Sequence, residues 1–272
     1  MSASAAVFSL HEVFYSYLHK YPAVSKVTLD IFSGQTVALL GANGSGKSTL
    51  LQILDGLIFP QEGKVDFLGK QLREDDFSDP VFSRDFRSKV GLLFQNSDIQ
   101  LFCPTVREDI AFGPLYLGFA PDEIEERIAQ MSARLRIEKL LDRAPYQLSV
   151  GEKRKVAIAG VLAISPDVLL LDEPTAGLDP ATVRQLLDLI FEYHAQGKTV
   201  ITATHDLHII REIADIVFIM GEDKTIVARG TSDEILANEE LLLRYNLAHI
   251  HKHRHGTQWH EHPHKHQDNS HH

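Results

Sequence analysis

Three features are scarce in this sequence of 272 residues, and each scarcity excludes a class of protein. The single cysteine, Cys103, rules out an internal disulfide. No apolar run approaches the roughly 20 residues that a membrane-spanning helix needs, and the N-terminus lacks the basic and apolar regions of a secretory leader. Lys and Arg number 27 against 37 Asp and Glu and form no basic stripe. We therefore expect a cytoplasmic protein that binds no nucleic acid.

A phosphate-binding loop stands out between residues 36 and 50. The run from Thr36 to Leu40 leads into Gly41-Ala-Asn-Gly-Ser-Gly-Lys-Ser-Thr49, which has the spacing G-x-x-x-x-G-K-[ST]. Its glycines allow successive N–H groups and the positive end of the following helix to face one anion. The residues expected to contact a nucleoside triphosphate are therefore Gly41, Ala42, Asn43, Gly44, Ser45, Gly46, Lys47, Ser48 and Thr49.

The last three residues of this motif should contact different parts of a bound triphosphate and its metal ion. Lys47 should reach the β- and γ-phosphates, and Ser48 should offer its hydroxyl to Mg²⁺. Thr49 should lie at the α- and β-phosphates. A chance match in a glycine-rich turn is the alternative, but a strand signal before the loop and a helical run after it favour a phosphate site.

Two carboxylates and a histidine complete the expected site. The apolar run from Val168 to Leu171 is typical of a buried parallel strand, and it ends in Asp172 and Glu173. We expect Asp172 to hold Mg²⁺ and Glu173 to orient or deprotonate the attacking water, although a helix-capping acidic pair would look the same. His205 follows another predicted strand and could contact the γ-phosphate, or it could be structural.

The remaining pattern predicts alternating strands and helices. Strands are predicted over 7–17, 24–31, 36–40, 64–67, 90–94, 168–171 and 199–204. Helices are predicted over 106–112, where Gly113-Pro114 should stop the helix, from Pro121 onward, from Ser149 through Val161, and over 182–195. Ser149 and Glu152 have the spacing of a capping box. Residues 73–85 are polar and are expected to form a surface connection.

The motifs together resemble those of the ATPase subunit of ATP-binding-cassette (ABC) transporters. The set is GANGSGKST, Gln95, LSVGE, VLLLDEP, AGLDP and His205, in this order, and the resemblance covers residues 5–240. It implies an α/β P-loop NTPase fold with a RecA-like core, an N-terminal antiparallel β subdomain and an α-helical signature subdomain inserted at about 96–163. One departure is Val150, which replaces the first of two adjacent glycines in the usual signature.

The resemblance also implies roles for residues outside the loop. Tyr17 would stack on adenine, and Gln95 would sense Mg²⁺ and the transmembrane partner. Asp179 would span the interface of a head-to-tail dimer, formed by identical or paired cassettes. Ser149 and Gly151 of one subunit would close over ATP bound by the other.

Two stretches, 95–118 and 148–164, look like the energy-coupling-factor branch of this family, in particular the ATPases of cobalt and nickel importers. That branch also serves vitamin uptake, so these stretches leave the cargo open. The expected partners are a transmembrane energy-coupling component and a metal-binding membrane subunit. The chain would then lie peripherally on the cytoplasmic face of the cell membrane.

The last residues, 241–272, are expected to be a flexible tail, because from His249 onward they hold ten of the 15 histidines and almost no apolar side chains. The histidines repeat at every second position. Imidazole suits Ni²⁺ and Co²⁺, so candidate ligands are His249, His251, His253, His255, His260, His262, His264 and His266. A purification tag or a merely solvated tail is the alternative.

The sequence therefore predicts the ATPase of a divalent-metal importer, for nickel or cobalt, that uses ATP and Mg²⁺. A vitamin importer subunit would have the same ATPase chemistry. A nickel metallochaperone GTPase would also combine a phosphate loop with histidines, but its usual Asn-Lys-x-Asp motif is missing. A cassette ATPase of DNA repair or translation fits the acidic charge poorly.

Overall fold

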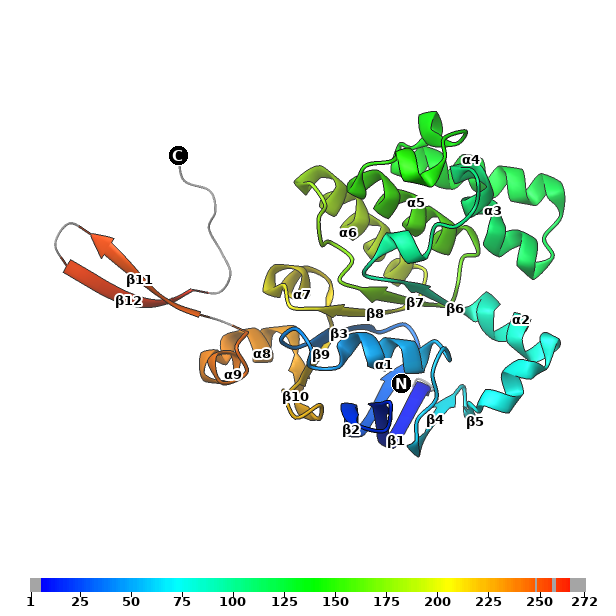
Figure 1. Ribbon diagram of the computed structural model, residues 1–272. Coiled ribbons are helices and arrows are strands. Elements are labelled where there is room, and N and C mark those ends of the chain that lie inside the picture. The colour runs from blue at the N-terminus through cyan, green and yellow to red at the C-terminus, as the bar shows by residue number, and fades with distance from the viewer. Residues whose placement is uncertain (1–5, 248, 256–257, 265–272) are drawn as a thin grey trace.

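The computed structural model describes residues 6–247, 249–255 and 258–264, and for the last two ranges only the course of the backbone (Figure 1). The described strands form three sheets of six, four and two strands. In Figure 1 the six-stranded sheet crosses the middle of the molecule, the four-stranded sheet lies below it, and a group of helices lies above it. The α/β architecture with an N-terminal antiparallel sheet is thereby confirmed.

The six-stranded sheet has the order β10-β9-β3-β8-β7-β6. Its parallel strands are β3 (Thr36–Leu40), β6 (Val90–Leu93), β7 (Val168–Asp172), β8 (Thr199–Thr204) and β9 (Ile216–Met220), and β10 (Ile226–Thr231) pairs antiparallel at one edge. β3, β6, β7 and β8 are buried along their whole length, as expected for parallel strands covered on both faces. Because these strands are parallel, their carboxyl ends meet at one edge of the sheet.

The four-stranded sheet is antiparallel and is built mainly from the N-terminal part of the chain. Its strands are β1 (Ala6–Tyr17), β2 (Tyr21–Phe32), β4 (Glu62–Phe67) and β5 (Lys70–Gln71). The helix α1 (Lys47–Leu54) packs in one hydrophobic core with residues of both sheets. The helix that follows the phosphate-binding loop is therefore held between two layers.

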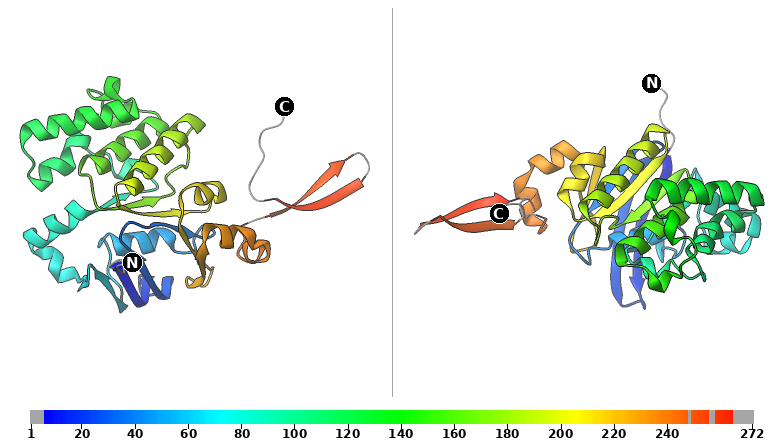
Figure 2. Two further views of the ribbon diagram at one scale, coloured as in Figure 1. Left: turned by 180° about the vertical axis from the view of Figure 1, so that it is seen from behind. Right: turned by 90° about the horizontal axis from the view of Figure 1, so that it is seen from above.

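A layer of helices covers the other face of the six-stranded sheet (Figures 1 and 2). It consists of α3 (Val106–Leu117), α4 (Pro121–Leu135), α5 (Val150–Ala163) and α6 (Pro180–Ala195), which share one core with β6, β7 and β8. The smaller helices α7 (Leu207–Ile213), α8 (Ser232–Ala237) and α9 (Glu239–Arg244) pack against β3 and β9. Leu242 and Leu247 are buried there, so the packed body continues past the expected boundary at residue 240.

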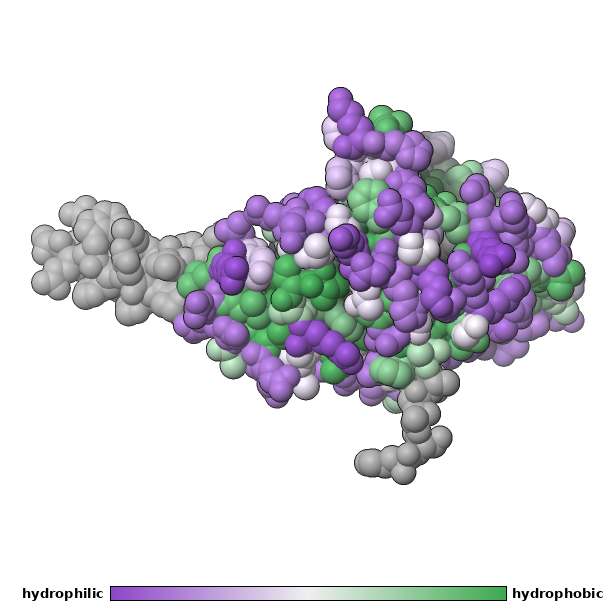
Figure 3. Space-filling view, turned by 90° about the horizontal axis from the view of Figure 1, so that it is seen from below, coloured by the Kyte–Doolittle hydropathy of each residue, from purple (hydrophilic) through white to green (hydrophobic). Residues whose placement is uncertain are grey.

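Short 3-10 turns complete the described helices. They span Glu74–Ser78, Ser97–Ile99, Glu138–Leu140 and Pro145–Gln147. The face of the molecule seen in Figure 3 is largely hydrophilic, with hydrophobic patches between the polar side chains.

The prediction that Gly113-Pro114 stops a helix was wrong. The helix α3 passes through both residues and ends at Gly118, whose φ of 81° suits a left-handed cap. The added Cβ of an alanine at Gly113 would lie 2.7 Å from a methyl carbon of Ile164, at the end of α5. Close packing against α5 therefore maintains a helix that the local sequence disfavours.

The prediction of a polar surface connection over 73–85 was also wrong. A 3-10 turn is followed by the helix α2 (Pro80–Lys89), which Asp79 caps by accepting a 3.0 Å hydrogen bond from the N–H of Val81. Aspartate before proline is a helix-start signal that the sequence did contain. Phe77, Phe82 and Phe86 pack together beneath these elements, with ring centroids 5.0 to 6.3 Å apart.

The histidine-rich segment forms a two-stranded sheet of its own. β11 (His249–His255) pairs antiparallel with β12 (Gln258–His264), in a register that sets His251 opposite His262. A lone pair of strands is marginally stable in water. The pairing of these strands therefore does not contradict the expected flexibility of the segment, which stays a prediction.

Candidate active site

The loop between β3 and α1 has the backbone that its glycines predict. Gly44 and Gly46 have φ angles of 78° and 109°, a region that disfavours other residues. A Cβ at Gly46 would lie 2.0 Å from the carbonyl oxygen of Ala23 in β2. Glycine is therefore required at this position by the contact between the loop and the N-terminal sheet.

Lys47 closes over the loop at the start of α1. Its Nζ donates hydrogen bonds of 2.7 Å to the carbonyl of Gly41 and 3.2 Å to that of Ala42, and it lies 3.9 Å from Oε1 of Glu173. The side chain is only 6% exposed. Burial lowers the pKa of Lys47, and the negative charges of Glu173 and Asp172 oppose that shift. The loop thus presents a positive charge held by neutral carbonyls, which an anionic phosphate could replace as partner.

Asp172 and Ser48 offer oxygen atoms suited to a hard cation. Asp172 is buried at the end of β7, and among the described residues its Oδ1 is buried without a hydrogen-bond partner. Burial raises the pKa of Asp172, while a hydrogen bond from the side chain of Ser48 lowers it. An unpaired carboxylate oxygen beside a serine hydroxyl fits Mg²⁺, which binds through one or two carboxylates together with phosphates and waters.

Glu173 is held in an uncommon backbone conformation at the end of the same strand. Its φ is 44°, a value that costs energy for a residue with a side chain. Its N–H donates 2.9 Å to the carbonyl of Ala203, which extends the pairing of β7 with β8. Its Oε1 lies 2.8 Å from Nδ1 of His205, and Thr204 Oγ1 donates to Oε2 at 3.3 Å. The carboxylate is therefore fixed by two neighbours from β8 and the residue after it.

A cavity of about 440 Å³ lies beside the loop, and its described lining includes Glu173 but neither Asp172 nor His205. Of the predicted residues, those lining it are Tyr17, Asn43, Gly44, Gly46, Lys47, Ser48, Thr49, Gln95 and Glu173. Tyr17 is 41% exposed, and its hydroxyl lies 3.2 Å from Oγ1 of Thr49. The structure thus brings Tyr17 of β1, the loop, Gln95 and Glu173 together around one cavity.

Lys224 also lines this cavity and was missed by the sequence analysis. It lies in the turn between β9 and β10, and its Nζ donates a 2.6 Å hydrogen bond to the carbonyl of Gly44. The lysine belongs to no motif. It reaches the loop because β9 is the neighbour of β3 in the sheet, and strand order is not readable from local sequence.

Three predicted nucleotide contacts lie elsewhere on the described chain. Ser149 caps α5 through the expected capping box: its N–H donates 2.8 Å to Glu152, and its Oγ accepts 3.3 Å from the N–H of Glu152. Asp179 caps α6 through Thr182. Ser149, Gly151 and Asp179 are absent from the described lining of the loop cavity. Their contact with nucleotide therefore stays a prediction that needs a second chain.

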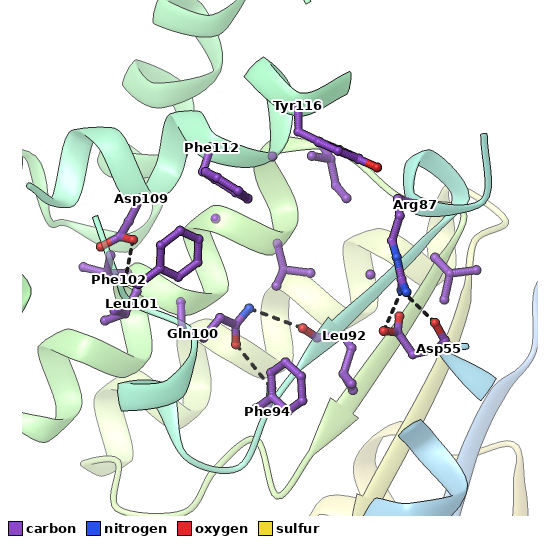
Figure 4. Close-up of a pocket in the computed structure, with 18 of the residues that line it drawn as sticks. Asp55, Arg87, Leu92, Phe94, Gln100, Leu101, Phe102, Asp109, Phe112 and Tyr116 are labelled. Carbon is purple, nitrogen blue, oxygen red and sulfur yellow. Dashed lines mark hydrogen bonds and ion pairs between the residues drawn. The ribbon is translucent and has the colours of Figure 1, made fainter. Parts of the chain in front are cut away.

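A second cavity, of about 410 Å³ and mainly apolar, lies between α2, β6, α3 and α5 (Figure 4). We call it the aromatic groove, because Phe102, Phe112 and Tyr116 are exposed in its wall. At one end Arg87 donates 2.7 Å hydrogen bonds to both the carbonyl and the carboxylate of Asp55. Burial raises the pKa of Asp55 to about 7, against the effect of the Arg87 charge.

Neither a metal cluster nor a membrane span is seen in the part of the chain that the structure describes. No group of three or more His, Cys, Asp or Glu side chains there is placed to hold a metal ion. The side chains of the eight predicted tail ligands, His249 to His266, lie outside the described residues. No described helix is both long enough and apolar enough to cross a bilayer.

Comparison with known proteins agrees with these features. The ABC transporter family model matches residues 24–176, more than half of the chain. A putative ABC transporter ATP-binding protein of Methanosarcina acetivorans is 46% identical over 92% of each chain. The nickel import ATP-binding protein NikO of Rhodobacter capsulatus is 44% identical over 88% of this chain and 95% of its own. The energy-coupling factor transporter ATP-binding protein EcfA of Methanothermobacter thermautotrophicus is 42% identical over 89% and 76%.

Solved structures give the same fold. cbiO1 from Clostridium perfringens, described as part of the ABC transporter complex cbiONQ, superposes with a TM-score of 0.73 at 36% identity, covering 89% of this chain and 95% of that one. A dimeric ATP-binding cassette, MJ0796, bound to ADP and Pi, superposes with a TM-score of 0.73 at 28% identity, covering 83% and 98%. The resemblance inferred from the motifs is confirmed: the chain belongs to the ABC transporter family, as a transport-coupled ATPase subunit of the energy-coupling-factor type.

Proposed function

We propose that the loop cavity binds MgATP, that Glu173 acts as the general base of its hydrolysis, and that the cassette powers import of nickel or cobalt. The observation that carries the catalytic part is the buried group of Lys47, Asp172 and Glu173 beside the loop. Two acids and a lysine shielded from water serve phosphoryl transfer, in which positioning and charge stabilisation supply most of the rate.

The loop residues bind the phosphates in this proposal. Lys47 turns from the carbonyls of Gly41 and Ala42 to the β- and γ-phosphates. Backbone N–H groups of the loop face the same anion, apart from that of Ser45, which donates to the carbonyl of Ala42. Ser48, Asp172 and Gln95 hold Mg²⁺, which when bound neutralises part of the phosphate charge. The aromatic face of Tyr17 takes the adenine base.

Glu173 and His205 serve the attacking water. The 2.8 Å contact with His205 sets the direction of the Glu173 carboxylate, whose oxygen accepts the proton as water attacks. His205 is half exposed, and in this proposal it also contacts the γ-phosphate. Glu173 thus supplies the base, and His205 supplies its orientation.

A dimer would complete the site. The capped start of α5 at Ser149 and Gly151, and the capped start of α6 at Asp179, lie outside the loop cavity of their own chain. A helix start is favourable for an anion. We therefore place these residues over ATP bound to the other subunit, as either a homodimer or a paired cassette, in line with the dimeric solved cassette.

The aromatic groove is the proposed docking site for the transmembrane component. Its exposed aromatic rings are the residue type enriched in interface hot spots. Asp109 accepts hydrogen bonds from the N–H groups of Phe102 and Cys103, while among the described residues its Oδ2 is buried without a partner. A partner segment with an apolar face would cover the exposed rings. The chain would then lie peripherally on the cytoplasmic face of the membrane.

Nickel or cobalt is the cargo that we favour over a vitamin. The tail histidines and the likeness to a nickel import ATPase support a metal, and the likeness to EcfA supports the energy-coupling-factor branch without naming a cargo. We propose that the tail binds Ni²⁺ or Co²⁺ as a local buffer, together with a metal-binding membrane subunit. Membership of the ABC transporter family argues against the metallochaperone GTPase.

The role of Glu173 predicts that Glu173→Gln keeps ATP binding within about twofold, since Lys47 and the loop are unchanged, and lowers turnover by at least about 100-fold through loss of the base. Equilibrium ATP binding and phosphate release measure the two effects. Glu126→Gln, an exposed change of the same kind on α4, should hydrolyse ATP normally. Brisk hydrolysis by Glu173→Gln would refute its assignment as base.

The groove proposal predicts that Phe112→Ala combined with Tyr116→Ala weakens binding to the transmembrane component by at least about tenfold, because exposed aromatic contacts are lost. Basal ATP hydrolysis by the isolated cassette should change by less than about twofold. Co-purification of the detergent-solubilised transporter measures assembly. Tyr146→Ala, which removes an exposed ring outside the groove, is the control. Normal assembly of the double variant would exclude the groove as the dock.

The cargo is tested by uptake of radiolabelled nickel, cobalt and a vitamin in cells carrying the intact transporter. Lys47→Ala should abolish metal uptake, because the phosphates lose their buried cation. Lys139→Ala, outside the loop cavity, should leave uptake unchanged. Lost vitamin uptake alongside unchanged metal uptake would instead support the vitamin importer.

The tail proposal predicts that a chain lacking residues 249–272 keeps basal ATP hydrolysis within about twofold, since these residues follow the packed body. Ni²⁺ binding by equilibrium dialysis should fall sharply in the shortened chain. In the full chain it should weaken towards about pH 5, where imidazoles protonate. Collapse of ATP hydrolysis, or full retention of Ni²⁺ binding, would contradict the proposal.

A further inference from the structure

Arg154 on α5 makes an unusual set of contacts. The residue is 2% exposed and lies five positions after the Ser149 cap. Its guanidinium donates to five backbone carbonyls, those of Phe94, Gln95 (3.1 Å), Asp172 (2.9 Å), Glu173 (2.8 Å) and Pro174 (3.3 Å). A guanidinium has five N–H groups in a fixed plane. Its N–H groups therefore donate to two segments of the chain, residues 94–95 and residues 172–174.

These two segments hold groups that the proposed hydrolysis needs. One follows β6 and contains Gln95, and the other ends β7 and contains Asp172 and Glu173. Arg154 itself does not line the described cavity at the loop. It therefore contacts the backbone beneath the catalytic side chains and leaves the reacting atoms to them.

Arg154 donates to the carbonyl of Glu173, whose backbone is strained. The φ of 44° at Glu173 is secured on one side by its N–H bond to Ala203 and on the other by its carbonyl bond to Arg154. A residue in such a conformation persists only where its surroundings determine it. Loss of the guanidinium would leave several buried carbonyls without a donor and release one side of Glu173.

The charge of Arg154 is compatible with this burial. Burial lowers the pKa of Arg154 to about 10, and the carboxylates of Asp172 and Glu173 oppose that shift, so the group stays positive at neutral pH. Burial raises the pKa of Asp172, and the charge of Arg154 opposes that shift. Arg154 thus combines hydrogen bonding with charge in a position that no motif indicated.

We propose that Arg154 is a positioning residue that fixes the Glu173 carboxylate and the Gln95 segment relative to the start of α5. A displacement of α5 then moves both segments, so the base is aligned only when the start of α5 is in place. This inference rests on the proposed role of Glu173. It adds that the side chain of Arg154 couples the alignment of Glu173 to the position of α5, the helix that Ser149 caps.

The test compares Arg154→Met, Arg154→Lys and Arg154→Gly with the unmodified chain. ATP affinity should stay within about twofold, because Arg154 does not contact the loop, while kcat should fall at least about tenfold in Arg154→Met. Arg154→Lys should recover part of the loss, since it keeps the charge and some donors. Guanidinium ion at millimolar concentration should raise the turnover of Arg154→Gly and not that of the unmodified chain, with sodium chloride at equal ionic strength as the salt control.

Arg184→Gln on α6, which removes an exposed arginine, is the matched control and should behave normally. Thermal unfolding identifies any variant that fails to fold. If Arg154→Met does not fold, the turnover of Arg154→Lys and the guanidinium rescue of Arg154→Gly decide. Unchanged kcat in folded Arg154 variants would overturn the inference, as would equal losses of ATP affinity and kcat. If Glu173→Gln still hydrolysed ATP, the proposed function would fail instead, so the two failures are distinguishable.

Discussion

The parallel hydrogen bonding of β7, β8 and β3 determines the geometry of the whole site. Leu40 pairs with Thr204 and Asp172 with Ala203, so three strands end at nearly the same level. Each is followed by a functional element: the loop, Glu173 or His205. Because these strands are buried on both faces, the polar groups at their ends are partly shielded from water, where charge interactions are stronger. The apolar strands thus create both the positions and the environment of the polar groups.

Features with a local cause were predictable from the sequence. The glycines of the loop, the apolar strand before Glu173 and the capping box at Ser149 each depend on a few adjacent residues. The extent of α3 was mispredicted, because its continuation through Pro114 depends on packing against α5. Lys224 and Arg154 could not be found, since one reaches the loop through strand order and the other looks like one more cation in Lys-Arg-Lys.

The described chain separates the parts that we propose to bind phosphates from the parts that would cover them. The loop and Glu173 share one cavity, whereas Ser149, Gly151 and Asp179 lie at helix starts outside it. Val150, where family members usually have glycine, is 72% exposed beside Gly177. In the proposed dimer this side chain would leave water on closure, and burial of a valine favours the closed state by up to about 2 kcal/mol.

The ion pair of Asp55 and Arg87 links the C-terminal end of α1 to the wall of the aromatic groove. The helix begins at Lys47 in the loop and ends at Leu54, and Arg87 ties its C-cap, Asp55, to α2 in the wall of the aromatic groove (Figure 4). Its eight residues form a rod about 12 Å long. A rod held at both ends transmits axial displacement with little loss. Phosphates pulling on one end would therefore shift the groove wall at the other, and pressure on the wall would shift the loop by the same path.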